Sequence, residues 1–117
     1  MKILIADDDQ DLRDIIKKFV KGNEVYTASN GLEALSIAKE ITPELIISDT
    51  MMPCMDGPEF LDKYTSENPV VKTILMSGKP LSYLKDIYPS ASKYVFLKKP
   101  FRYSEFKQVF SEVTKTA

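Results

Sequence analysis

Acidic, hydroxyl and basic side chains follow four short apolar runs of the sequence. Asp7 and Asp8 end the first run, Asp49 follows a later one, and Ser77 and Lys99 follow the last two. Converging carboxylates repel one another and therefore favour a hard divalent cation, and Mg²⁺ suits a site with few protein oxygens. An ionised aspartate can also attack phosphorus, while ammonium and hydroxyl groups neutralise the phosphoryl oxygens. These residue types predict Mg²⁺-assisted phosphoryl chemistry if the fold brings them together.

The elements that would position these residues alternate along the chain. Short runs rich in Ile, Val, Leu and aromatic residues predict strands, whereas apolar residues at helical spacing predict the helices between them. We expect a helix after each strand, with Asn30 capping the second, Gly57-Pro58 opening the third, and the fourth limited to about two turns between Pro80 and Pro89. The expected strands are 2–6, 24–28, 44–48, 72–76 and 93–97.

Strict alternation of strands and helices predicts an α/β fold, a (βα)5 doubly wound parallel sheet with helices on both faces. Two strand orders are common in such sheets, one beginning 3-2-1-4-5 and the other 2-1-3-4-5. In the order 2-1-3-4-5, the four strands that end in charged or hydroxyl residues are neighbours. Ligands bind such sheets beyond the carboxyl ends of the strands, which is where these residues fall.

Composition excludes several classes of function. The 117 residues fit one domain, and the net charge of −1 argues against a general nucleic-acid binder. Without histidine, the chain has no histidine base and no histidine-ligated metal. The lone Cys54 allows no internal disulfide, and no apolar run suits a signal peptide or a membrane span, so we expect a cytoplasmic protein.

Four motifs, in this order, resemble those of the receiver domain of two-component response regulators. They read ILIADDDQDLRD, ELIISDTMMPCMDG, ILMSGKP and FLKKPF, and the likeness runs from Met1 to the last helix. The resemblance implies a flavodoxin-like (CheY-like) sheet of order 2-1-3-4-5 and a single receiver domain over 1–117 with no output domain. It implies phosphorelay signal transduction, with no enzymatic turnover beyond self-catalysed phosphorylation and dephosphorylation.

The same resemblance assigns roles to residues. Asp49 matches the phosphoacceptor, Asp8 a direct Mg²⁺ ligand, and Asp7 an acid that acts chiefly through coordinated water. The backbone carbonyl of Met51 is expected to complete the metal site, and Lys99, followed by a cis bond to Pro100, matches the lysine of the family. Two switch residues complete the set, namely Ser77, which bonds the phosphoryl group, and Phe96.

The resemblance also implies partners. A sensor histidine kinase or a histidine phosphotransfer protein would supply the phosphoryl group, and an unidentified protein would receive the signal, without direct binding to nucleic acid or membrane. Lys79 lies at a position that tunes phosphoryl lifetime in the family, and its effect here stays open between shielding the acyl phosphate and hindering water.

Simpler interpretations compete at several positions. We expect Asp9 to cap the first helix or lie in solvent, Asp56-Gly57 to form a turn into a helix, and Lys98 and Cys54 to be surface or loop residues. An interaction module that no longer needs phosphorylation is one alternative function. An aspartyl-nucleophile phosphohydrolase is a weaker one, because Met51 stands where such enzymes carry a second aspartate.

Overall fold

Strands and helices alternate throughout the computed structural model, which describes residues 1–115. The described strands are β1 (Lys2–Ala6), β2 (Glu24–Ala28), β3 (Leu45–Asp49), β4 (Lys72–Ser77) and β5 (Val95–Lys98). The described helices are α1 (Gln10–Phe19), α2 (Gly31–Ile41), α3 (Gly57–Glu67), α4 (Leu81–Ile87) and α5 (Tyr103–Thr114), with a short 3₁₀ helix, η1 (Pro89–Lys93), between α4 and β5.

The strands form one parallel sheet in the order β2-β1-β3-β4-β5, which confirms the predicted fold class and selects between the two strand orders. The register aligns Asp49 of β3 with Met76 of β4, and Ser77 of β4 with Lys98 of β5. The polar ends of β1, β3, β4 and β5 therefore meet at one edge of the sheet.

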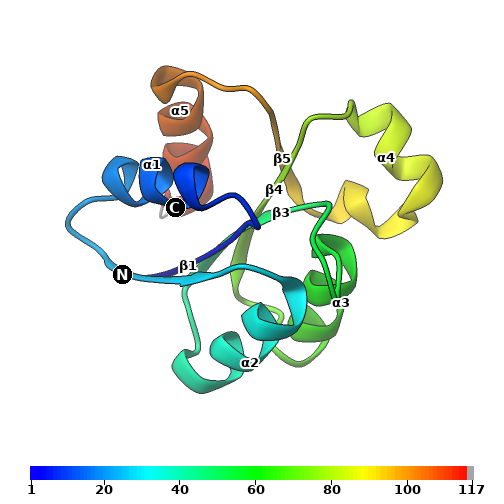
Figure 1. Ribbon diagram of the computed structural model, residues 1–117, viewed down its shortest axis with the longest axis horizontal. Helices are drawn as coiled ribbons and strands as arrows, with labels where there is room; N and C mark the ends of the chain where they lie inside the picture. Colours follow the sequence, from blue (N-terminus) through cyan, green and yellow to red (C-terminus); the bar gives the residue numbers. More distant parts are fainter. Residues whose placement is uncertain (116–117) are drawn as a thin grey trace.

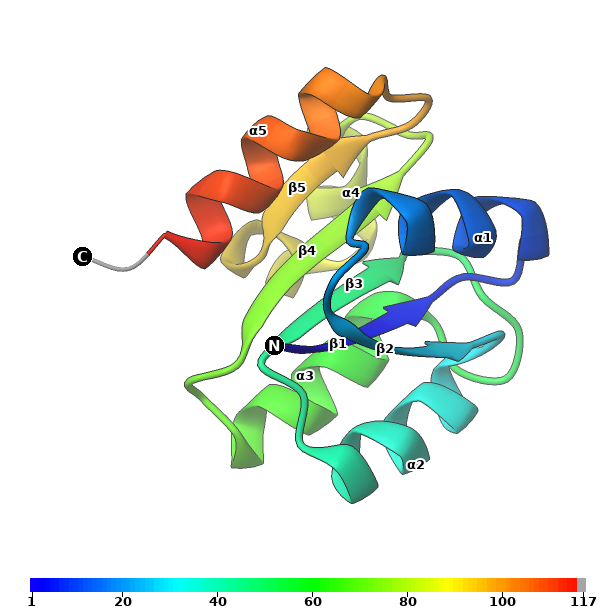
Figure 2. The ribbon, with the colours of Figure 1, turned by 90° about the vertical axis from the view of Figure 1, so that its left-hand side faces the viewer.

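Helices cover both faces of this sheet. α1 and α5 lie on one face, and α2, α3 and α4 lie on the other (Figures 1 and 2). Alternate residues of the buried strands point to opposite faces, so Ile3 and Ile47 join the core under α1 and α5, whereas Leu4 and Ile46 join the core against α2 and α3. Burial on both faces explains why β1 and β3 read as continuous apolar runs.

The bounds of three strands, β3, β4 and β5, differ from the prediction. β3 and β4 each reach one residue further, to Asp49 and Ser77, because backbone pairing continues across the sheet at these positions. The fifth strand begins at Val95, two residues later than predicted. Pro89 opens η1, and its turn bonds, which include Tyr94 N–H to the Ala91 carbonyl, engage the backbone that was assigned to the strand.

Aspartate and asparagine side chains cap the starts of three helices, as predicted for Asp9 and Asn30. Asp9 accepts hydrogen bonds from two backbone N–H groups of α1, and Asn30 and Asp56 each accept one at the start of α2 and α3. The seven residues of α4 confirm its predicted shortness. α1 ends at Phe19, and Gly22 lies in the turn beyond it, with φ +97°.

Within residues 1–115, the structure contains no helix both long and apolar enough to cross a membrane.

Candidate functional site

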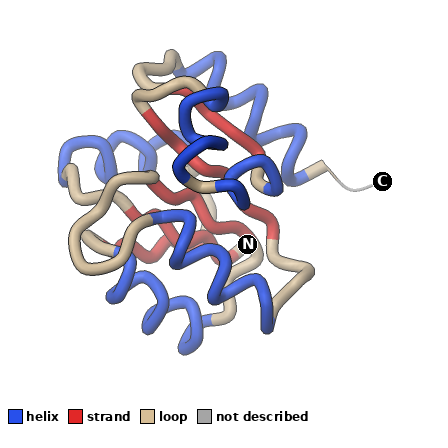
Figure 3. The backbone as a smooth tube through the Cα atoms, turned by 90° about the vertical axis from the view of Figure 1, so that its right-hand side faces the viewer, coloured by secondary structure: helices blue, strands red, loops and turns tan. Residues whose placement is uncertain are grey.

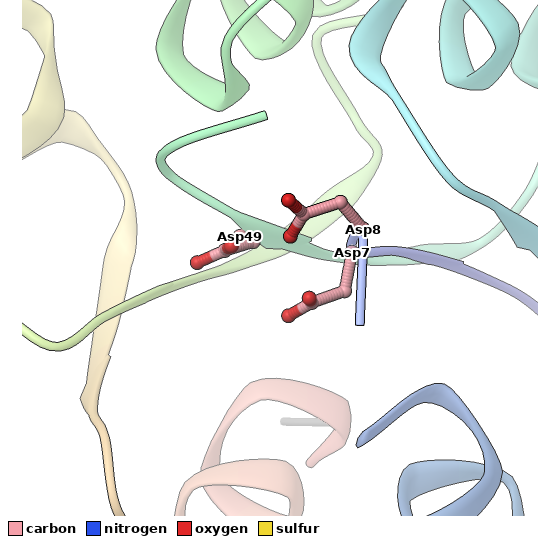
Figure 4. Close-up of side chains that lie close together, drawn as sticks. All are labelled: Asp7, Asp8 and Asp49. Atoms are coloured by element: carbon pink, nitrogen blue, oxygen red, sulfur yellow. The ribbon is translucent and has the colours of Figure 1, made fainter. Parts of the chain in front are cut away.

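Three aspartates gather where β1 and β3 end. Asp7 and Asp8 follow β1, Asp49 closes β3, and one carboxylate oxygen from each lies within 4.8 Å of the others (Figure 4). Asp7 and Asp49 are buried, whereas Asp8 is exposed. Parallel strands 1 and 3 are neighbours in the sheet, which is why residues 42 positions apart in the sequence form one cluster.

Lys99 brings a positive charge into this cluster from the loop after β5. Its Nζ lies 2.9 Å from Asp7 Oδ2 and 3.0 Å from Asp49 Oδ1. The peptide bond between Lys99 and Pro100 is cis, as the resemblance implied. Burial acts to lower the pKa of Lys99, but the hydrogen bonds and charges of the two aspartates outweigh burial and raise that pKa. Lys99 is therefore a charged bridge between Asp7 and Asp49.

Asp7 is held in place by several hydrogen bonds. Its backbone N–H donates to the Ala28 carbonyl at 3.1 Å, its Oδ1 accepts from the Asp9 N–H at 2.9 Å, and its carbonyl accepts from Arg13 Nη1 at 2.6 Å. Together with Lys99, these contacts fix both the backbone and the carboxylate of Asp7. Asp7 is thus a rigid acid, and the exposed Asp8 beside it is the carboxylate most open to a ligand from solvent.

The local environment disfavours the charge on Asp49. Burial raises the pKa of this carboxyl group, and the negative charge of Asp7 raises it further, while Lys99 and the Thr50 N–H act in the opposite direction. Lys99 pairs with Asp7 and Asp49, and Asp8 adds a third carboxylate, so the cluster keeps an excess of negative charge. A ligand that brings positive charge would relieve this repulsion.

The chemistry of the donor set fits a hard divalent cation. Three carboxylates within one cluster supply the oxygen ligands that Mg²⁺ prefers, and the exposed Asp8 gives access from solvent. Met51, whose carbonyl was predicted as a further ligand, lies two residues after Asp49 on the same loop. Its side chain is 65% exposed and its Sδ accepts a hydrogen bond from the Tyr88 hydroxyl at 3.9 Å.

Ser77 lies buried at the end of β4, the strand next to Asp49. Its Oγ accepts a hydrogen bond from the Lys79 N–H at 2.9 Å. The ammonium group of Lys79 lies 5.7 Å from the centre of the Tyr83 ring, so this side chain contacts α4. Phe96, the second predicted switch residue, is half-buried and packs against the core beneath α2, α3 and α4.

The structure gives the remaining candidates ordinary roles, as the simpler interpretations predicted. Asp9 caps α1, Asp56 caps α3, and Lys98 and Cys54 are exposed, Cys54 with φ +70° in the loop after β3. Lys99, unlike these residues, lies within the acid cluster.

Two residues of the site escaped sequence reasoning. Arg13 is bonded to the Asp7 carbonyl, and the buried Thr50 hydroxyl donates to the Met76 carbonyl at 2.7 Å. Arg13 stands six positions after Asp7, and its basic charge close to three acids was a usable signal. Thr50 offered only a hydroxyl directly after Asp49, at a point where the chain still belongs to the core.

Comparison with protein families gives one match over almost the whole chain. Residues 3–111 match the model of the response regulator receiver domain. Among curated proteins, the chain is 38% identical over 81 residues to the chemotaxis protein CheY of Listeria monocytogenes, covering 67% of this chain and 68% of that protein. It is 34% identical over 99 residues to the sensor kinase CckA of Brucella abortus, covering 80% of this chain but only 10% of the kinase.

Solved structures show the same likeness. The chemotaxis response regulator CheY4 of Vibrio cholerae superposes with a TM-score of 0.85 at 29% identity, over 96% of this chain and 97% of that one. The receiver domain of the Francisella response regulator 1452 gives a TM-score of 0.82 at 29% identity, over 99% and 98% of the two chains.

Proposed function

The chain belongs to the receiver domain family of two-component response regulators, whose function is phosphorelay signalling, and we propose that Asp49 is its phosphoacceptor. One observation carries this proposal: Asp49 ends the central strand β3 and lies between acids from β1 and an ammonium group from the loop after β5. We propose in addition that residues 1–117 act as a single receiver domain.

In the proposed reaction, a carboxylate oxygen of Asp49 attacks phosphorus. A new oxygen–phosphorus bond forms as the bond from phosphorus to the donor breaks, and the donor leaves with the bonding electron pair. Lys99, 3.0 Å from Asp49 Oδ1, offers a positive charge to the phosphoryl oxygens. The Ser77 hydroxyl, at the end of the adjacent strand, offers a hydrogen bond to the same group. Hydrolysis by water would reverse the modification, so the chemistry is self-catalysed and stops at the protein.

We assign Mg²⁺ binding to the carboxylates of Asp8 and Asp49 and to the Met51 carbonyl, with Asp7 acting through coordinated water. This division is supported by the contacts of each acid, because Asp7 already bonds Lys99 and the Asp9 N–H, whereas Asp8 is exposed. Bound Mg²⁺ would supply positive charge that offsets both the repulsion of the acids and the charge of the incoming phosphoryl group.

The signal is proposed to leave through Ser77 and Phe96. A phosphoryl group on Asp49 would draw the Ser77 hydroxyl toward it, and Phe96 on the neighbouring strand β5 would move into the space released. Such a change biases a pre-existing equilibrium between two surfaces around α4, β5 and α5. An unidentified protein would bind one of these surfaces in preference to the other.

A histidine kinase or phosphotransfer protein is the proposed donor. A groove of about 540 Å³ beside Lys99 is lined by apolar side chains from α1 and from the loop after β5, and it supports docking of a donor protein next to Asp49. Ile15, 43% exposed in this groove, would be an anchor. The apolar residues that line the groove are Leu12, Ile15, Phe19, Pro100 and Phe101.

A cytoplasmic location of the protein stays a prediction.

The test is incubation with Mg²⁺ and acetyl phosphate followed by intact-protein mass spectrometry. Wild-type protein should gain one phosphoryl group, and Asp49→Asn should gain none. Omission of Mg²⁺ should abolish the gain in the wild type. Equal labelling of wild type and Asp49→Asn, or no labelling of either, would contradict the proposal. Saturable stabilisation by Mg²⁺ distinguishes an intact site from a phosphorylation-independent interaction module.

A further inference from the structure

Thr50, directly after Asp49, is fully buried and takes part in three hydrogen bonds. Its backbone N–H donates to the Met76 carbonyl at 3.0 Å, and its hydroxyl donates to the same carbonyl at 2.7 Å. Its own carbonyl accepts from the Gly57 N–H, at the start of α3, at 2.8 Å. Thr50 therefore joins the ends of β3 and β4 to the beginning of α3.

The two hydrogen bonds that Thr50 donates to the Met76 carbonyl lie on the path between two residues of the site. Met76 precedes Ser77, so the carbonyl that Thr50 holds belongs to the peptide unit whose nitrogen is that of Ser77. The Ser77 carbonyl in turn accepts from the Lys99 N–H at 2.7 Å. A continuous chain of hydrogen bonds thus connects Thr50, through the Met76–Ser77 peptide, to the backbone of Lys99.

We propose that the Thr50 hydroxyl is a positioning group that sets the orientation of Ser77 relative to Asp49. This inference rests on the proposed function, because it concerns the approach of Ser77 to a phosphoryl group on Asp49. A carbonyl oxygen has two lone pairs, and Thr50 occupies both on Met76. Loss of the hydroxyl leaves one bond, so the strand pairing survives while the Met76–Ser77 peptide gains freedom to rotate.

Ser48 provides a matched control on the other side of Asp49. It is equally buried, and its hydroxyl donates to the Asp49 carbonyl at 2.9 Å. That bond closes within β3 and does not reach β4. Removal of the Ser48 hydroxyl therefore costs a buried hydrogen bond next to Asp49 without releasing Ser77, which separates positioning from a general loss of stability.

The experiment compares Thr50→Val, which keeps the volume, Thr50→Ser, which keeps the hydroxyl, and Ser48→Ala. Three quantities are measured: the rate constant of phosphorylation by acetyl phosphate at saturating Mg²⁺, the Kd for Mg²⁺, and the midpoint of thermal unfolding. We expect Thr50→Val to lower the rate constant about tenfold, because small misplacement of a reacting group slows catalysis strongly. Thr50→Ser and Ser48→Ala should stay within about twofold of the wild type, and the Mg²⁺ Kd should stay within about twofold in all three.

Equal rates for Thr50→Val and Ser48→Ala would overturn the inference, as would failure of Thr50→Ser to retain the wild-type rate. A parallel loss of Mg²⁺ affinity in Thr50→Val would also overturn it, because the hydroxyl would then act on the acid cluster. Should Thr50→Val not fold, Thr50→Ala removes the same hydroxyl and is judged by the same criteria. A wild-type protein that accepts no phosphoryl group would overturn the proposed function itself, whereas the outcomes above leave that function intact.

Discussion

Two clusters in the described part of this protein contain aspartates, and they differ in the charge and hydrogen-bond partners of the carboxylates. In the strand-end cluster of Asp7, Asp8 and Asp49, the ammonium group of Lys99 pairs with Asp7 and Asp49. In the Asp62 cluster, between α3 and η1, one carboxylate accepts hydrogen bonds from two hydroxyls. Ser90 Oγ donates to Asp62 Oδ2 at 2.7 Å, and the Tyr94 hydroxyl donates to Asp62 Oδ1.

The difference separates a binding site from a structural contact. The Asp62 cluster has a donor for each carboxylate oxygen and needs no ligand, and it ties the segment after α4 to α3, on the side of the molecule seen in Figure 3. The strand-end cluster has three carboxylates beside two cationic side chains, Lys99 and Arg13, so it keeps an excess of negative charge. Acidic residues alone therefore do not identify a site; the ratio of carboxylates to donors does, and the predictions below test that ratio.

The largest expected effect is on Mg²⁺ affinity. Asp8→Asn should weaken Mg²⁺ binding about 100-fold, equivalent to about 2.7 kcal/mol, because it removes the exposed ligand of the strand-end cluster. Asp9→Asn and Asp62→Asn, which change acids outside that cluster, should shift the Kd less than about twofold. Isothermal titration calorimetry measures all three. Equal weakening by Asp8→Asn and Asp9→Asn would show that position within the acidic run does not matter.

Removing the acceptor of the Asp62 cluster should lower stability. Asp62→Ala leaves the hydroxyl of the buried Tyr94 without its partner, which should cost about 2 kcal/mol of unfolding free energy. Asp86→Ala, at an exposed position of α4, is the control and should stay within about 0.5 kcal/mol. Urea denaturation gives both values. A neutral Asp62→Ala would mean that the contact between α3 and η1 does not stabilise the fold.

Removing one negative charge from the strand-end cluster should raise the unfolding free energy, whereas Asp62→Ala lowers it. Burial and the charge of Asp7 raise the pKa of Asp49, so its ionised form is disfavoured in the folded protein at neutral pH. Asp49→Asn should therefore raise the unfolding free energy in Mg²⁺-free buffer, by roughly 1 kcal/mol. The gain should shrink as Mg²⁺ is added, because the cation stabilises the wild type more. Destabilisation by Asp49→Asn without Mg²⁺ would remove the contrast between the two clusters.

A further effect, at the Asp62 cluster, is expected at alkaline pH. Burial, with the hydrogen bond to Asp62, raises the pKa of Tyr94 from 10.0 to about 12. A raised folded-state pKa means that this contribution to stability is complete below pH 10 and is lost as pH rises from about 10 to about 12. The stability difference between wild type and Tyr94→Phe should therefore narrow over this window. Urea midpoints measured at pH 9, 10 and 11 would contradict the assignment if that difference stayed constant.

The strand-end cluster was predictable from the sequence, whereas the Asp62 cluster was not. Parallel strands place their carboxyl ends at one edge, so polar residues after each apolar run had to meet once the strand order was chosen. Asp62, Ser90 and Tyr94 lie on a helix, in a 3₁₀ turn and just before a strand, where each reads as an ordinary surface or core residue. Their meeting depends on where η1 packs, and no local pattern records that.

The same distinction explains the other differences. Capping by Asn30 is local and was predicted correctly, as were the turn at Asp56-Gly57 into α3 and the shortness of α4 between two prolines. The start of β5 was misplaced because Lys93 and Tyr94 fit a strand by composition, yet the turn bonds of η1 engage them first. The bond of Thr50 to Met76 spans 26 residues and needs the β3–β4 register, which the sequence alone does not give.

The most direct test locates the phosphoryl group. Protein phosphorylated by acetyl phosphate in Mg²⁺ is reduced with borohydride, which converts an aspartyl phosphate to homoserine, and is then digested and sequenced by tandem mass spectrometry. The account predicts homoserine at position 49, with aspartate unchanged at positions 7, 8 and 62. Homoserine at any of those three positions, with Asp49 unchanged, would contradict the claim that the strand-end cluster directs phosphorylation to Asp49.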